Sequence, residues 1–225
     1  MPVTELAWIP SATPGSIPPA FLEAGKKGME AQSEWAAAYA SSTLPSGPPA
    51  ARGAALYQQR EDRGIVLVTA HWDSPAQHAE CIAGKENRQA MTAIASHAIV
   101  SDIKFFHVKG VQMFSKETLD AGLLSILRIS VGIEEGKREQ VEKIWNEVKE
   151  LLVTSAGFEH TGGWKVEKDQ GEEGRDEFVV VGAWRLEDAL SRFAGGKKWE
   201  NARAWDEMWK GVVLGMDVKA YSRIA

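Results

Sequence analysis

The chain has 225 residues, of which 44% are hydrophobic and 25% charged, a composition typical of globular proteins. Its formal net charge of −5 argues against partners such as nucleic acid or an anionic membrane, because both require a basic face. A single cysteine, no apolar run near the ~20 residues of a membrane helix and no signal-peptide pattern together favour a cytoplasmic protein.

The first half of the chain predicts the element order β-α-β-β-α-β. Its second helix begins at the sequence Asp-Ser-Pro, in which Ser74 is a typical N-cap and Pro75 suits the first helical turn. For the remaining elements, alternation of apolar and polar residues predicts the strands, and apolar residues at helical spacing predict the helices. The predicted elements are a strand over 3–10, a helix over 19–39, strands over 54–61 and 64–72, a helix over 75–98 and a strand over 103–110.

The second half of the chain predicts the same order. Apolar residues recur at helical spacing from Val141 to Leu152, and β-branched residues dominate the stretch before them. The predicted elements are a strand over 123–133, a helix over 134–157, strands over 160–169 and 177–186, a helix over 190–211 and a strand over 216–224.

The two halves also share a sequence pattern. The segment IVLVTAHWDSPAQHAECIAGKENRQAM (65–91) returns in altered form as VVVGAWRLEDALSRFAGGKKWENARAW (179–205). The order of elements is that of a ferredoxin-like unit, so we expect an α+β protein with two tandem units, residues 1–115 and 120–225. Helices cover only one face of such a sheet, and the other face needs a partner. We therefore expect the two units to pack sheet to sheet within one chain, as an internal dimer. The whole chain is then either a monomer or part of a homodimer built on outer surfaces.

A Pro-, Gly- and Ser-rich segment over 41–53 has no counterpart of its length in the second half. It is either a solvated linker or a lid over the edge of a pocket.

The two Trp-bearing segments resemble the dimeric α/β-barrel superfamily, especially its antibiotic-biosynthesis-monooxygenase-like branch in tandem, fungal-type form. In that branch a strand ends in an aromatic residue and leads through a polar turn into a helix, as "AHW-DSPAQ" and "GAW-RLED" do here. The resemblance implies that the two units form an intramolecular dimeric α/β barrel, with a pocket between each sheet and its helices. It also implies chemistry without metal or organic cofactor on polycyclic phenols, although other members isomerise lactones, cyclise polyketides or bind haem, and some have no known activity.

The sequence departs from that family at one helical position. Where the family often carries histidine, this chain has Cys81 and Phe193, which disfavours haem ligation. The first half keeps a polar stripe of His78, Cys81 and Lys85, whereas the second half is apolar around Phe193. We therefore expect the site in the first half, with an open cavity beside Trp72 and a closed or smaller one beside Trp184.

Five residues are the candidates for this site. His78 is the predicted catalytic acid or base, because an imidazole titrates near neutrality. Trp72 follows the small Ala70 on the same strand face, which leaves room for a flat ligand, although the ring could equally pack under the helix. The other predicted substrate-binding residues are Tyr57, Cys81 and His107, each with a packing alternative. His71 is expected in the sheet–sheet interface, and His160 at the surface or in a turn.

Two classes of function follow. The first is a cofactor-independent enzyme of secondary-metabolism type that oxygenates, cyclises, isomerises or dehydrates an aromatic or polyketide-like molecule. The second is a non-catalytic relative that binds a small apolar ligand or serves a structural role. No group of residues has metal-ligand spacing, and no Gly-rich loop suits a phosphate. A tautomerase with Pro2 as its base is a third, less fitting possibility, because each half contains a Trp-bearing hairpin.

Overall fold

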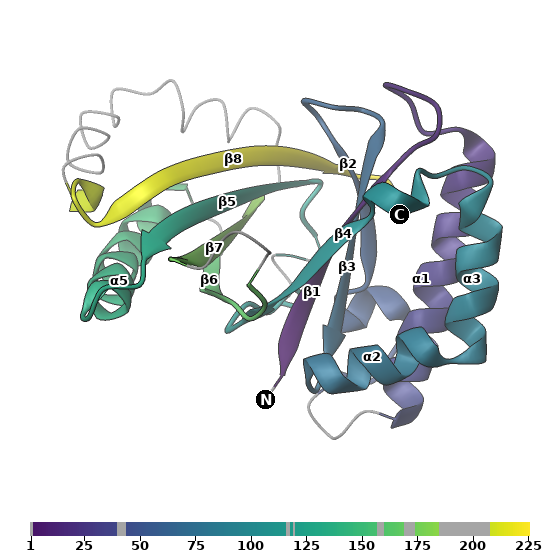
Figure 1. Cartoon of the computed structure of the whole chain (residues 1–225), viewed down its shortest axis with the longest axis horizontal. Coiled ribbons are helices and arrows are strands. Elements are labelled where there is room, and N and C mark those ends of the chain that lie inside the picture. The colour runs from purple at the N-terminus through teal and green to yellow at the C-terminus, as the bar shows by residue number, and fades with distance from the viewer. Residues whose placement is uncertain are drawn as a thin grey trace.

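The computed structural model shows an α+β protein built on a closed eight-stranded antiparallel barrel with helices outside it (Figure 1). The structure describes residues 2–39, 44–115, 118, 120–156, 160–168, 174–184 and 208–225, with the backbone alone for 151–156. The strands are β1 (Val3–Pro10), β2 (Ala55–Gln59), β3 (Ile65–Trp72), β4 (Lys104–Lys109), β5 (Leu123–Gly132), β6 (His160–Lys165), β7 (Arg175–Trp184) and β8 (Val213–Arg223). The helices are α1 (Pro19–Tyr39), α2 (Pro75–Ala83), α3 (Lys85–Ala95) and α5 (Lys137–Ala156), with 3₁₀ turns η1 (Pro49–Arg52) and η2 (Val100–Asp102).

The strands follow the order β1-β3-β2-β8-β5-β7-β6-β4 around the barrel. Within each half the relative order is the same, since β4-β1-β3-β2 in the first half corresponds to β8-β5-β7-β6 in the second. The two sheets are joined at their edges by the pairs β2–β8 and β4–β6, so they form one barrel instead of two stacked layers. Closure of this kind pairs the edge strands that an open sheet would expose.

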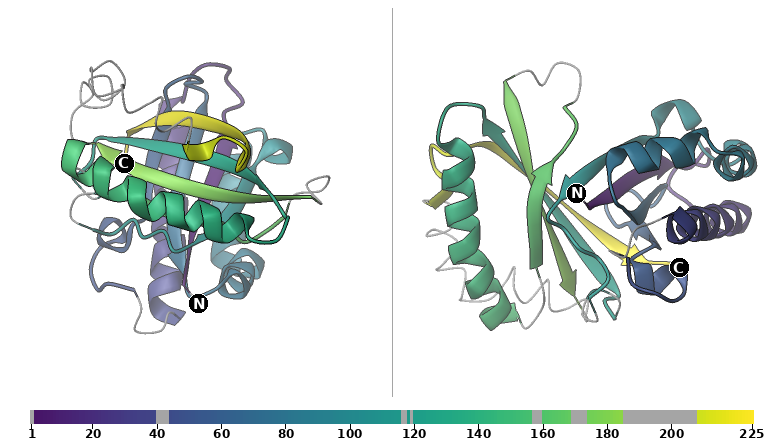
Figure 2. Two further views of the ribbon diagram at one scale, coloured as in Figure 1. Left: turned by 90° about the vertical axis from the view of Figure 1, so that its left-hand side faces the viewer. Right: turned by 90° about the horizontal axis from the view of Figure 1, so that it is seen from below.

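The helices lie on two opposite sides of the barrel (Figure 2). Helices α1, α2 and α3 cover the outer face of the first half, and α5 covers that of the second. No helix in the described part of the chain is long and apolar enough to cross a membrane.

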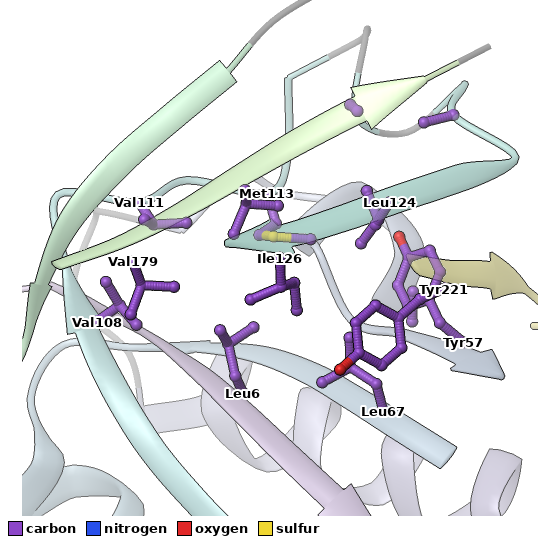
Figure 3. Packing of buried hydrophobic residues seen from close by; sticks show 14 of the residues in the cluster. Leu6, Tyr57, Leu67, Val108, Val111, Met113, Leu124, Ile126, Val179 and Tyr221 are labelled. Carbon is purple, nitrogen blue, oxygen red and sulfur yellow. The ribbon is translucent and has the colours of Figure 1, made fainter. Parts of the chain in front are cut away.

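The barrel interior is the main hydrophobic core (Figure 3). Leu6, Leu67 and Val108 point into it from three strands of the first half, and their neighbours in sequence point outward to the helices, because side chains alternate along a strand. The second half contributes the same kind of side chain, and Tyr221 accepts a hydrogen bond from Trp8 Nε1 at 2.8 Å. The labelled core residues are Leu6, Tyr57, Leu67, Val108, Val111, Met113, Leu124, Ile126, Val179 and Tyr221.

The prediction of one continuous helix over 75–98 is wrong, because the helix is broken at Gly84. This residue has an extended backbone (φ −70°, ψ 164°), so α2 ends before it and α3 begins after it. The predicted N-cap is confirmed, since Ser74 Oγ accepts from the backbone N–H of Gln77 at 3.2 Å. Of the predicted helix over 190–211, residues 190–207 with Phe193 lie outside the described residues.

Gly163→Ala should destabilise the barrel at its β4–β6 junction. A Cβ on Gly163 would lie 1.7 Å from the carbonyl oxygen of Lys109, so one strand would have to shift away from the other. We expect the free energy of unfolding to fall by roughly 3 kcal/mol or more in urea denaturation. The control is Gly215→Ala in β8, where a Cβ meets nothing within 4 Å among the described residues. Equal stability of the two variants would contradict this account of the junction.

Candidate functional site

A cavity of about 210 Å³ lies in the first half, between the outer face of the sheet and helices α1, α2 and α3. Its wall is apolar apart from four side chains, those of Glu5, Gln32, His78 and Asn87. Ile82 and Phe105 also line it while remaining 38% and 45% exposed, so the cavity reaches the surface between α2 and β4. An apolar pocket with a few convergent polar groups is the usual form of a small-molecule site.

Glu5 is the buried carboxyl of this cavity. It sits in β1 on the face that turns toward the helices, directly across from Ala70 on β3 and His107 on β4. The small Ala70 leaves space beside it. Burial raises the pKa of the Glu5 carboxyl from 4.5 to about 7, against the opposing effect of a hydrogen bond from Trp72. Glu5 therefore changes its charge close to neutral pH.

Trp72 holds Glu5 and His78 in place. Its indole Nε1 donates to Glu5 Oε2 at 2.8 Å, and its ring stacks on the His78 imidazole with centroids 4.4 Å apart and an interplanar angle of 15°. Trp72 was expected to line the large cavity, but it lines a void of about 10 Å³ behind it. The large cavity lies in the first half, but Trp72 does not line it, because the stacked His78 ring lies between the two.

His78 stands in the first turns of α2 and lines the cavity. Its Nε2 lies 3.4 Å from Glu5 Oε2, and its Nδ1 lies 2.9 Å from His107 Nε2. The side chain is only 2% exposed, and this burial lowers the pKa of His78 to about 3, with a further contribution from His107. His78 is therefore a neutral imidazole at physiological pH.

His107 and Glu167 continue this chain of contacts toward the second half. His107 Nδ1 lies 2.5 Å from Glu167 Oε1, and the backbone N–H of His107 donates to Glu167 Oε2 at 2.8 Å. Glu167 follows β6, so the closure of the barrel brings it beside β4. Burial acts to raise the pKa of the Glu167 carboxyl, but the hydrogen bonds from His107 outweigh it and the pKa is lowered overall. Glu167 is thus an ionised hydrogen-bond acceptor.

The second half differs from the first at the register positions of Glu5 and His107. Trp184 pairs with Leu123 as Trp72 pairs with Val3, and Trp184 Nε1 donates to Ser125 Oγ at 3.0 Å where Trp72 donates to Glu5. Ala220 lies across from Ser125 in the second half, as His107 lies across from Glu5 in the first.

The space beside Gly182 in the second half is filled by His160. Its ring atoms lie 2.8 Å and 2.9 Å from the place where a Cβ on Gly182 would stand. His160 was expected at the surface, and this expectation is wrong, because it is buried against Trp184 with ring centroids 5.2 Å apart. Residues 185–207, which were expected to close the cavity beside Trp184, lie outside the described residues.

Tyr57 and Cys81, like Trp72 and His107, are not among the residues that line the large cavity. Tyr57 points into the barrel core, on the opposite face of the sheet, where the alternation of β2 directs it. Cys81 packs against Trp72, and burial raises the pKa of its thiol to about 12, which makes it a poor nucleophile. By contrast, His78 and His107 are in direct contact.

The described part of the Pro-rich segment, residues 44–53, does not cover the large cavity. Leu44 and Arg52 line the small void next to Trp72, and Arg52 Nε donates to Ser33 Oγ on α1 at 3.0 Å. The lid interpretation therefore finds no support in this segment. His71 faces the barrel side as expected, where its Nδ1 lies 3.1 Å from Thr4 Oγ1 and its Nε2 accepts from the Met113 N–H at 3.0 Å.

Glu5 and Glu167 were not among the site residues predicted from the sequence. A signal for Glu5 was present, because it shares a strand face with Val3, Ala7 and Ile9, all apolar and turned toward the helices. A charged residue in that phase is an exception that points to a site. Glu167 had no comparable signal, since only the barrel closure brings it to His107. Among the described residues, no group of three or more His, Cys, Asp and Glu side chains is arranged to hold a metal ion.

Solved structures with this fold are known. An anthrone oxidase-like protein matches with a TM-score of 0.64 and 14% identity over 100% of this chain and 92% of that one. The "putative monooxygenase" of Lactobacillus acidophilus NCFM gives 0.55 and 12% over 99% and 93%. A heme-binding protein from Thermus thermophilus gives 0.52 and 11% over 100% and 92%.

At these identities the likeness concerns the fold alone. No protein-family model matches the sequence, and no curated protein matches it either. What the chain does must therefore be argued from the site itself, because one fold hosts many functions.

Proposed function

We propose that this protein is a cofactor-independent enzyme that acts on a small aromatic or polyketide-like molecule in the first-half cavity. The observation that carries the proposal is Glu5, a buried carboxyl with a pKa of about 7 that lines an apolar cavity beside the neutral imidazole of His78. Perturbed titratable groups in an apolar cleft are typical of active sites. The two solved structures named after oxidase or oxygenase activity agree with this class.

The common chemistry of the candidate reactions is proton transfer. Oxygenation, cyclisation, isomerisation and dehydration of a phenol or keto compound each require a proton to leave a carbon or oxygen of the substrate. General acid–base catalysis works best when the pKa of the catalytic group is near the operating pH, and this condition favours Glu5 over His78. In this mechanism the Glu5 carboxylate takes the proton, and His78 serves as its hydrogen-bond partner.

A haem group fits this site poorly. A haem needs an axial ligand, and His78 is the histidine that α2 presents to the cavity. Both of its ring nitrogens already face other side chains, Nδ1 at 2.9 Å and Nε2 at 3.4 Å. We therefore propose chemistry without haem.

We also infer that the two halves are tandem ferredoxin-like units that arose by duplication, with a boundary between residues 115 and 120. The matching strand order supports this, as does the equivalent pairing of Val3 with Trp72 and of Leu123 with Trp184. In this interpretation the first unit kept the acid–base groups, and the second unit became scaffold.

The proposal is tested with anthrone as a substrate, by following its conversion with O₂ into anthraquinone and water. We expect Glu5→Gln to lower the rate by roughly 10²-fold or more, because the amide preserves the shape of the carboxylic acid but cannot take a proton. Glu147→Gln, on the exposed face of α5, is the matched control and should leave the rate unchanged. Equal rates for Glu5→Gln and the wild type would remove Glu5 from the mechanism.

Binding in the cavity is tested separately with 2-naphthol, by fluorescence titration. Ala90→Phe on α3 places a ring in the cavity and should weaken binding, whereas Ala93→Phe on the exposed face of the same helix should not. Binding that Ala90→Phe abolishes, together with no turnover of anthrone or related phenols by the wild type, would favour the non-catalytic ligand-binding alternative.

A further inference from the structure

A continuous line of polar side chains leads from the cavity across β4 to Glu167, which follows the neighbouring strand β6. The distances between successive partners are 3.4 Å from Glu5 Oε2 to His78 Nε2, 2.9 Å from His78 Nδ1 to His107 Nε2, and 2.5 Å from His107 Nδ1 to Glu167 Oε1. Each imidazole takes part through both of its nitrogens. An imidazole held in this way can accept a proton on one nitrogen while it releases one from the other.

The exposure of these side chains changes along the line. Those of His78 and His107 are each 2% exposed and that of Glu5 is 5% exposed, whereas that of Glu167 is 35% exposed. The line therefore begins at a buried group beside the cavity and ends at a carboxylate in contact with solvent. A purely structural ion pair would not require two histidines in series between these ends.

The hydrogen bonds assign a direction to each proton. Glu167 is ionised and can only accept, so His107 Nδ1 carries a hydrogen. While His107 is neutral, its Nε2 accepts from His78 Nδ1, which leaves the lone pair of His78 Nε2 facing Glu5. A protonated Glu5 then donates to that nitrogen. The arrangement is consistent with the raised pKa of Glu5 and the lowered pKa of His78.

The surroundings of Glu5 offer few competing charges. The groups that act on it or lie beside it are His78 and Cys81 from α2, His107 from β4 and Glu167 beyond β6. The side chains with which α1 and α3 line the cavity are uncharged. In the second half the residues in register with Glu5 and His107 are Ser125 and Ala220, which cannot relay a proton between them.

We propose that His78, His107 and Glu167 form a proton relay that connects Glu5 in the cavity with solvent on the far side of β4. In one transfer the O–H bond of Glu5 breaks as an N–H bond forms at His78 Nε2. The N–H bond at His78 Nδ1 breaks at the same time as one forms at His107 Nε2. The products are a Glu5 carboxylate, a neutral His78 and a His107 imidazolium that the Glu167 carboxylate stabilises.

The relay gives the site a way to exchange protons while its cavity is closed by substrate. The imidazolium of His107 passes its Nδ1 proton to Glu167, whose partly exposed side chain releases it to water. The same steps in reverse return a proton to Glu5. This inference rests on the proposed function only in taking Glu5 as the group that exchanges a proton with the substrate.

The test is the exchange of the His78 Nδ1 proton with water, followed by NMR on the full chain with ¹⁵N-labelled histidine and 2-naphthol in the cavity. We expect Glu167→Gln and His107→Gln to slow this exchange by roughly tenfold or more, because each keeps a hydrogen-bonding amide in place but cannot carry the proton. Glu147→Gln on α5 is the charge-matched control and should have no effect. Formate added to a Glu167→Ala variant should restore the exchange, which it would not do for a structural role.

Backbone amide exchange in α2 and β4 is measured on the same samples. Unchanged His78 exchange in both relay variants would overturn the relay, as would faster His78 exchange accompanied by faster amide exchange in these elements. The result is independent of turnover, because the measurement needs no reaction. If the relay variants leave His78 exchange unchanged while turnover still depends on Glu5, the relay is wrong and the proposed function stands. If the relay variants slow His78 exchange while turnover does not depend on Glu5, the proposed function alone is removed.

Discussion

Glu5→Gln is expected to make the protein more stable relative to the wild type as the pH rises. The folded-state pKa of Glu5 is about 7 and its ordinary value is 4.5, so the folded state binds this proton more tightly than the unfolded state. The wild type therefore has the full contribution of this proton below about pH 4.5 and loses it as the pH rises through 7. The difference between the two ends corresponds to on the order of 3 kcal/mol for a shift of this size.

Glutamine is a suitable probe because it resembles the protonated acid. Its amide oxygen can accept from Trp72 Nε1, and its NH₂ group can donate to His78 Nε2. Burial lowers the folded-state pKa of His71 and His78 to about 3. Their contribution to the free energy of unfolding has the opposite pH dependence, because it is lost as the pH falls below about 6.5. Both histidines are present in each protein, so the comparison isolates Glu5.

The measurement is urea denaturation of the wild type and of Glu5→Gln at pH 5 and pH 8. The free energy of unfolding of the variant, relative to that of the wild type, should increase from pH 5 to pH 8. A difference that stays constant across this range would show that Glu5 has an ordinary pKa and would weaken its assignment as the acid–base group.

Trp72→Ala is expected to lower the free energy of unfolding by on the order of 3–5 kcal/mol, which makes it the most destabilising single change proposed for this site. The ring is 1% exposed and packs against Ala36, Ala70 and Cys81. Its removal would also leave His78 without its stacking partner and Glu5 without its hydrogen-bond donor. The sequence left a ligand-binding role and a packing role equally open for Trp72, and its position behind His78 favours packing.

Trp72→Phe separates the two roles of the ring. Phenylalanine retains most of the apolar burial and the stacking but cannot donate to Glu5, so the loss should be smaller, about 1–3 kcal/mol. Because this hydrogen bond lowers the pKa of Glu5, its loss should raise that pKa further. Urea denaturation gives the stability, and carboxyl ¹³C NMR gives the titration. A loss below about 1 kcal/mol for Trp72→Ala would contradict the packing described for this residue.

The periodicity of the sequence predicted most of the fold. The alternation of polar and apolar residues placed β1, β3 and β5 within a residue or two of their observed bounds, and the helical pattern did the same for α1. The helix over 75–98 was predicted in one piece, because periodicity continues across Gly84 and does not report a local change of ψ. The same alternation correctly assigned His71 and Trp72 to opposite faces of their sheet.

The sequence by itself determined most of the elements and the placing of His71 and Trp72 on opposite faces of their sheet. Local backbone preference and hydrophobic period are sufficient for these features, because they act between near neighbours. Only the tertiary structure decided that Glu5, His78, His107 and Glu167 form one line, since they come from three separate elements and a loop beyond a fourth. The pKa of Glu5 likewise depends on burial by helices that are distant in sequence, and burial is a property of the folded chain alone.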